Sequence, residues 1–227
     1  MASSRPAISL TGVRVTVAPT RRLPQLVLGL LLYGGSDALL VRARLGLDPW
    51  DVLQQGVSNR LHLDFGVVSA IVGAIVLLGW IPLRQRPGVG TVANVFLVAL
   101  SIDAVLALVS PPTALWARIG LLVAGVLLNG VATACYIGAR LGPGPRDGLM
   151  TGLSARTGWS IRLVRILIEL TVLAAGWLLG GTVGVGTVLY AVAIGPLAQL
   201  FLPRLLWRPA SAVPAPSPDT SSASSGQ

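Results

Sequence analysis

The chain has 227 residues, of which 53% are hydrophobic and 11% are charged, and its mean hydropathy is +0.77. Soluble globular domains carry about 25% charged residues, so this composition excludes a single soluble globule and predicts a protein of the lipid bilayer. The net charge of +9 comes from arginines that flank apolar runs, which is typical of membrane loops and argues against a nucleic-acid partner.

Both ends of the chain differ from the apolar middle. Residues 1–22 contain arginines and small residues but no uninterrupted apolar run, so they predict a cytoplasmic leader and not a cleaved signal peptide. Residues 209–227 are rich in Pro, Ala and Ser and predict a disordered tail. The single cysteine, Cys135, lies in an apolar run and is expected to be a packed core thiol.

Six stretches between these ends approach the roughly 20 residues that a helix needs to cross a bilayer. Helices are expected because only helices and closed barrels satisfy their backbone in lipid, and the sequence shows no alternating pattern of strands. The stretches are approximately 23–42, 65–83, 90–109, 118–139, 161–180 and 186–206.

A charged phrase occurs twice in the chain. ARLGLDPWDVLQQG at 43–56 and ARLGPGPRDGLMTG at 139–152 are offset by 96 residues (139 minus 43), and the run GVGTV recurs at the same offset. The sequence therefore predicts a duplication, with membrane repeat 1 at 23–109 and membrane repeat 2 at 118–206. Each unit holds three crossings and one short helix.

Three crossings per unit would make the second unit enter the membrane from the opposite face, which gives an inverted pair. The arginines favour this arrangement with the N-terminus and the C-terminus in the cytoplasm, because most of them then lie inside. Arg84, Arg140 and Arg146 are placed inside, and Arg44 and Arg118 outside. The alternative, in which the short helices also cross and the repeats are parallel, requires a polar and short crossing.

The phrase has the chemistry of a helix start. In the first copy Asp48 can cap the helix, Pro49 begins it and Asp51 occupies the first turn. The same places are held in the second copy by Gly144, Pro145 and Asp147. Each copy predicts a helix of about 12 residues, or about 18 Å, that lies in the interface or re-enters the membrane.

Other residues shared by the two copies are expected to have structural roles. Arg60 and Arg156 follow the two acids by nine residues, near the negative ends of the short helices. Gly46 and Gly142 precede the prolines by three residues and are assigned to the same structural group.

Two half-helices that enter from opposite faces would bring their N-terminal ends to the midplane, where inverted-repeat transporters build their sites. Asp51 and Asp147 are therefore candidates for a substrate or ion pathway, although capping alone would also explain them. Trp50 in the first copy is replaced by Arg146 in the second. A shared site would have one aromatic wall and one cation.

Charges inside the apolar stretches give a second group of candidates, since such charges usually face a bundle interior or a water-filled cavity. Asp37, Asp103 and Glu169 belong to this group. Arg165 stands one helical turn before Glu169 and can pair with it. A self-neutralising pair that fixes the helix rotation is the favoured interpretation, and a relay is the alternative.

Catalytic signatures are missing from the sequence. No HExxH, GxSxG or CxxC motif occurs. We therefore expect no catalytic residue, no metal site, no cofactor and no enzymatic activity.

LGLDPWDVL, ARLGPGPRDGLM, RTGWSIRLVRILIEL and GWLLGGTVGVGTVLYAVAIGPL resemble the YczE/YyaS/YitT group of bacterial integral membrane proteins. The resemblance covers about residues 24–206 and implies an all-α polytopic protein of the bacterial plasma membrane, without a settled substrate or reaction. The chain contains arginine but no lysine and is rich in alanine, a composition typical of a GC-rich bacterial genome.

Three classes of function remain. The favoured hypothesis is a small permease or secondary transporter, which rests on the duplication, the paired helix starts and the intramembrane acids. The alternative is an accessory membrane protein that assists a membrane-associated partner, and a membrane enzyme ranks third. The expected partners are the lipid bilayer and a second copy of the chain, while the sequence names no substrate.

Overall fold

The computed structural model describes residues 15–207. The leader and tail predicted at 1–22 and 209–227 lie wholly or mostly outside this range. Within it the chain is all-helical, as expected. Its eight helices are α1 (Pro19–Ala43), α2 (Pro49–Leu61), α3 (Phe65–Trp80), α4 (Val89–Leu108), α5 (Leu115–Gly138), α6 (Pro145–Thr157), α7 (Ile161–Leu178) and α8 (Val185–Leu205).

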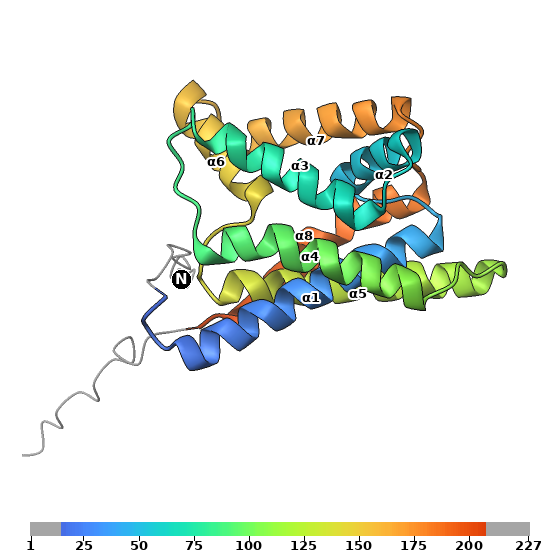
Figure 1. Ribbon diagram of the computed structural model, residues 1–227, viewed down its shortest axis with the longest axis horizontal. Helices are drawn as coiled ribbons and strands as arrows, with labels where there is room; N and C mark the ends of the chain where they lie inside the picture. The colour runs from blue at the N-terminus through green and yellow to red at the C-terminus, as the bar shows by residue number, and fades with distance from the viewer. Residues whose placement is uncertain (1–14, 208–227) are drawn as a thin grey trace, which may run out of the picture.

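The helices form two layers, which Figure 1 shows one above the other. One layer contains α1, α4, α5 and α8, with α1 packed against α4 and α5, and α5 packed against α8. The other contains α2, α3, α6 and α7, where α2 packs against α7 and α6 packs against α3. The contacts of α3 with α4 join the two layers.

Four helices of the described residues, α1, α4, α5 and α8, are long and apolar enough to cross a membrane. A fifth span results if α2 and α3, which meet at a bend of 117°, are counted as one. The expected number was six. Two of the six expected spans, α3 and α7, are not among the four. α3 is short for a span, with 16 residues, and α7 carries three charged residues, Arg162, Arg165 and Glu169.

Glycines allow α1 and α5 to approach closely at the centre of the first layer. A Cβ atom at Gly29 of α1 would lie 2.7 Å from the backbone nitrogen of Tyr136 in α5. Leu26 and Leu30 of α1 are almost fully buried beside this contact. The α1–α5 interface is therefore built on backbone contact, as small residues permit between helices in membranes.

Arginines satisfy the carbonyl groups at the ends of these two helices. Arg22 donates from Nε to the Ala139 carbonyl (2.8 Å) and from Nη2 to the Arg140 carbonyl (2.9 Å). Arg118 donates to Ala43 (2.9 Å) and Arg44 (2.6 Å) in the same way. α1 begins at Pro19, a residue suited to the first helical position, and so takes in residues that the sequence assigned to the leader.

Backbone hydrogen bonds also recur at the offset of 96. Gly90 N donates to the Leu141 carbonyl (2.9 Å), and Gly186 N donates to the Leu45 carbonyl (2.7 Å). Each bond ties the start of α4 or α8 to the loop before a short helix of the other half of the chain. The loops that carry the two phrases are thereby fixed against the first layer.

Gly29→Ala is expected to lower the free energy of unfolding by about 1–3 kcal/mol, because the new methyl group meets backbone atoms that cannot move aside. Gly120→Ala in α5 is the matched control, since a Cβ there has no neighbour within 4 Å and alanine favours a helix. Thermal unfolding of the detergent-solubilised protein compares the two. Equal midpoints would contradict the close α1–α5 packing.

Candidate functional site

The first short helix starts as the sequence predicts. Pro49 is the first residue of α2, and Asp48 caps it by accepting a hydrogen bond at Oδ1 from the Asp51 backbone nitrogen (2.8 Å). Asp48 and Asp51 are both buried. The capping role of this phrase is therefore confirmed, and it places two carboxylates in the interior of the protein.

The second short helix, α6, starts with Pro145 and lacks a side-chain cap because Gly144 holds the N-cap position. Trp80 of α3 fixes this end by donating from Nε1 to the Pro145 carbonyl (3.0 Å). Tyr136 donates to Asp147 Oδ2 (3.2 Å). Burial raises the pKa of the Asp147 carboxyl above its ordinary value, and the Tyr136 hydrogen bond and the charges of Arg165 and Arg146 oppose that rise.

Glycine is required at the turn before each short helix. Gly46 and Gly142 have φ values of +115° and +130°, a region that disfavours side chains. A Cβ at Gly46 would also lie 2.8 Å from Thr187 N, and one at Gly142 would lie 2.9 Å from Thr91 Oγ1. The positive φ values and these short distances explain why glycine is needed at both positions.

The two phrases meet through Arg146. Its Nη1 lies 3.3 Å from Asp48 Oδ2 and its Nη2 lies 3.4 Å from Asp51 Oδ1. Its guanidinium carbon also lies 5.2 Å from the ring centre of Trp50, in a cation–π contact. Arg146, whose side chain is 25% exposed, is therefore paired with two buried carboxylates. The expected meeting of one aromatic residue, Trp50, with one cation, Arg146, is confirmed. The side of the membrane on which Arg146 was counted stays a prediction.

A cavity of about 330 Å³ lies beside this ion cluster. The charged residues of its lining are Asp48, Arg146, Asp147, Arg165 and Glu169. Its aromatic residues are Tyr33, Trp50, Tyr136 and Tyr190. The volume is within the range of small-molecule sites, which combine an apolar wall with a few placed polar groups.

Asp37 belongs to the same region and is almost fully buried. Asn129 donates from Nδ2 to Asp37 Oδ1 and to Ser36 Oγ (2.8 Å each), and Tyr190 donates from its hydroxyl to Asn129 Oδ1 (2.9 Å). This chain of bonds links α1, α5 and α8. The interhelical role expected of an asparagine in a membrane bundle is thus performed by Asn129.

Asp103 is placed elsewhere. Its Oδ1 accepts a hydrogen bond from the Gly66 backbone nitrogen (2.7 Å) at the start of α3. The residue is not part of the cavity lining, and its observed contact is a cap that joins α4 to α3. Nothing in this contact supports the pathway role that the sequence suggested.

Arg165 and Glu169 form the expected pair, with Nε and Oε1 2.8 Å apart. Their side chains are 56% and 31% exposed, yet both also face the cavity. The pairing is confirmed, and the role of the pair in fixing the rotation of α7 stays a prediction. Its position leaves it in contact with whatever enters the cavity.

Arg60 and Arg156 bind beyond the ends of their own helices. Arg60 Nε donates to the Leu179 carbonyl (3.4 Å), after α7, and Arg156 Nη1 donates to the Pro82 carbonyl (2.8 Å), after α3. The sequence located both near the ends of α2 and α6. It did not reveal that α2 packs against α7 and α6 against α3, which brings these other carbonyls within reach.

Several residues of the site were not singled out as functional from the sequence. Tyr33, Tyr136 and Tyr190 were missed, and Asp48 was treated as a cap alone. Tyrosines are scarce in this chain, which has three. That all three lie in apolar runs is the signal that could have found them, because a buried tyrosine hydroxyl needs a polar partner.

Arg146→Met is expected to destabilise the protein by about 3–5 kcal/mol, because it leaves the buried Asp48 and Asp51 without a counter-charge. Adding Asp51→Asn to it should restore part of this loss. Arg165→Met removes a largely exposed pair and should cost at most about 1 kcal/mol. Thermal unfolding in detergent measures all three. Equal losses for the two arginine variants would show that Arg146 is not an interior ion partner.

The model of a family of unknown function, DUF6198, matches residues 20–203. An uncharacterized protein of Haemophilus influenzae is 40% identical over 197 residues, which cover 87% of this chain and 90% of that protein. Two Bacillus subtilis proteins are also similar. The uncharacterized membrane protein YczE is 33% identical over 78% of this chain and 83% of its own length. The uncharacterized protein YyaS is 27% identical over 78% of this chain and 90% of its own length.

No solved structure matches the chain. The resemblance to YczE and YyaS that the motifs suggested is confirmed, and a multi-pass membrane protein agrees with the four candidate spans. By the match over 20–203, the chain belongs to the DUF6198 family.

Proposed function

We propose that this protein is a small permease or secondary transporter of the bacterial plasma membrane. The observation that carries the proposal is the meeting of Arg146 with Asp48 and Asp51 beside a cavity of about 330 Å³. Buried ionisable groups at the ends of broken membrane helices are typical of transport sites. The charged and aromatic lining suits a small polar substrate.

We also propose that the two halves are inverted repeats, with α3 and α7 as additional crossings. Support comes from contacts that recur at the offset of 96: Arg22 and Arg118 bind the ends of α5 and α1, and α2 and α6 pack against α7 and α3. Three crossings in each half would give the opposite orientations. α3 and α7 are short for a crossing and would require a locally thin bilayer.

The side of the cavity next to α7 is the proposed entrance. In the first half of the chain α3 packs against α4. The corresponding helix of the second half, α7, packs against α2 and α6 and not in the same way against α8. A Cβ at Gly195 of α8 would have no neighbour within 4 Å, although Gly195 lines the cavity. Arg165 and Glu169 stand on the α7 side of this opening.

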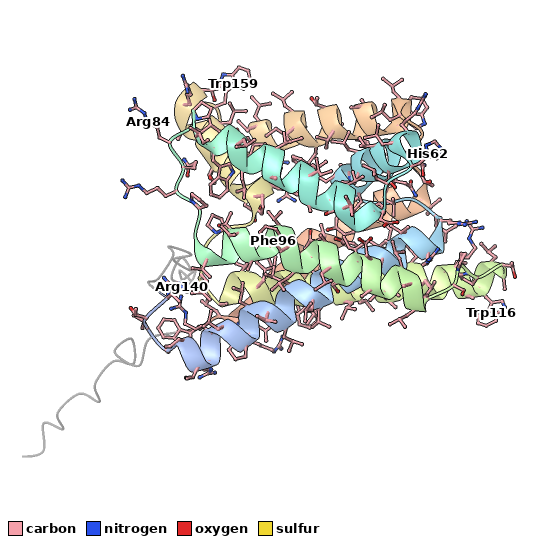
Figure 2. The ribbon with its side chains drawn as sticks, in the orientation of Figure 1. His62, Arg84, Phe96, Trp116, Arg140 and Trp159 are labelled. Carbon is pink, nitrogen blue, oxygen red and sulfur yellow. The ribbon has the colours of Figure 1, made fainter. Side chains whose placement is uncertain are left out.

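The proposed orientation places the N-terminus and C-terminus in the cytoplasm. In Figure 2, Arg84 and Arg140 lie at the end of the molecule where α1 begins, and His62 and Trp116 lie at the other end. An excess of arginine near the first end agrees with the positive-inside rule. We extend the proposal to a homodimer, which the mass of the protein in a nanodisc would measure.

The proposal predicts saturable solute flux in liposomes that contain the purified protein. The screen uses a panel of amino acids, amines, organic acids and nucleobases. Asp51→Asn and Asp147→Asn should reduce the flux at least tenfold at equal protein content, because Asp147 lines the cavity and Asp51 pairs with Arg146, which lines it. Asp64→Asn, which changes an exposed acid, is the control. A stoichiometric co-purifying partner without any flux would favour the accessory-protein alternative.

The inverted arrangement predicts that His62→Cys and Trp159→Cys label from opposite faces of the membrane. Both positions are exposed and lie at opposite ends of the molecule (Figure 2). A Cys135→Ala background removes the single native thiol, and a membrane-impermeant thiol reagent is applied to intact cells and to inverted vesicles. Residue 62 should react from outside and residue 159 from inside. Reaction of both from one face would contradict the inverted repeat.

A further inference from the structure

Three carboxylates gather at the centre of the protein. Asp37 comes from α1, Asp48 precedes α2 and Asp51 lies in its first turn. One oxygen of each lies within 4.8 Å of an oxygen of both others. Their exposed fractions are 1%, 2% and 0%, so water at the surface does not solvate them.

The charges of this cluster do not balance when all three carboxyl groups are ionised. Arg146 is the cation bonded to it among the described residues, and it contacts Asp48 and Asp51. Three ionised carboxylates and one guanidinium leave two negative charges, which either a bound cation or protonation of the carboxyl groups would remove. Uncompensated buried charge is strongly unfavourable in an apolar interior.

The neighbouring polar groups are neutral and do not remove this charge. Asn129 donates to Asp37, and Tyr190 donates to Asn129. With the Gln54 amide oriented to suit its neighbours, its nitrogen lies 3.3 Å from Asp51 Oδ1 and its oxygen 3.1 Å from Arg146 Nη2. These bonds orient the cluster but add no positive charge.

Two atoms of the cluster point independently to a ligand. Asp37 Oδ2 and Asp51 Oδ2 are buried and have no hydrogen-bond partner, although the other oxygen of each carboxylate is bonded. Buried polar atoms are nearly always satisfied. These two acceptors without a donor belong to the consecutive helices α1 and α2, and a cation is a partner that could satisfy both.

We propose that Asp37, Asp48 and Asp51 bind one divalent cation of the Mg²⁺, Mn²⁺ or Ca²⁺ class. Its charge would neutralise the remaining two negative charges, and carboxylate oxygens are the ligands that these ions prefer. Ligand oxygens around one such ion stand up to about 4.8 Å apart, twice a metal–oxygen distance of about 2.4 Å. Asp48 and Gln54 line the cavity, which provides the route of entry.

This proposal does not rest on the transport proposal, because a bound cation would also hold α1 to α2 in a protein that moves no solute. It adds a role for Asp37, to which the hydrogen bonds of Asn129 and Tyr190 lead. Metal binding and solute flux are measured separately, so either proposal can fail alone.

Mn²⁺ is the probe for the wild-type protein in nanodiscs. The amplitude of the electron paramagnetic resonance signal of free Mn²⁺ measures binding, and thermal unfolding measures the effect on stability. We expect one saturable Mn²⁺ per chain, displaced by Ca²⁺ or Mg²⁺, and an unfolding midpoint that rises with Mn²⁺ concentration. Wild-type protein without saturable binding, or with a midpoint that responds to pH and not to Mn²⁺, overturns the proposal.

Isosteric variants locate the site. Asp37→Asn and Asp51→Asn should each weaken Mn²⁺ binding at least tenfold and abolish the rise in midpoint. Asp37→Asn should keep or raise the metal-free midpoint, since it removes one of the unbalanced charges. The exposed Asp64→Asn should bind as the wild type does. Unchanged binding by Asp37→Asn would place the cation elsewhere and overturn the assignment.

Discussion

A guanidinium inside an apolar bundle must be paired, and the pairing of Arg146 organises the centre of this protein. Its partners, Asp48 and Asp51, belong to the other copy of the repeated phrase. The bond therefore holds the starts of α2 and α6 together, although the two helices lie far apart in the chain. Trp50 completes the contact from one side, and the cavity lies beside it.

Close backbone packing determines where the cluster of Arg146, Asp48 and Asp51 forms. Gly29 lets α1 touch α5, and the turns at Gly46 and Gly142 lie against the starts of α8 and α4. The loops that carry the two phrases cannot move far from the first layer as long as these contacts hold. A rigid frame of this kind can support buried charges, whose net stabilisation depends on good geometry.

Local signals predicted the parts of the site that depend on near neighbours in the chain. Pro49 and Pro145 begin helices, Asp48 caps one, and Arg165 pairs with Glu169 at a spacing of one helical turn. Of the long-range partners, the sequence predicted the meeting of Trp50 with Arg146 and not the ion pairs of Arg146. The pairing of Arg146 with Asp48 and Asp51 and the role of Asp103 at the start of α3 were not recognised, because a charge in a sequence does not reveal which distant atom will pair with it.

The sequence by itself determined that this is a helical membrane protein, that one phrase occurs twice, and where the short helices begin. Composition, apolar run length and helix capping decide the class of the protein and the helix starts, because they act within a few turns of helix, and the repeated phrase is read directly from the sequence. Only the tertiary structure decided that Arg146 meets Asp48 and Asp51, that Asp37 joins them, and that the three tyrosines surround one cavity. Those outcomes depend on how α1, α2, α5, α6 and α8 pack together, since burial and counter-charge are properties of the assembled bundle.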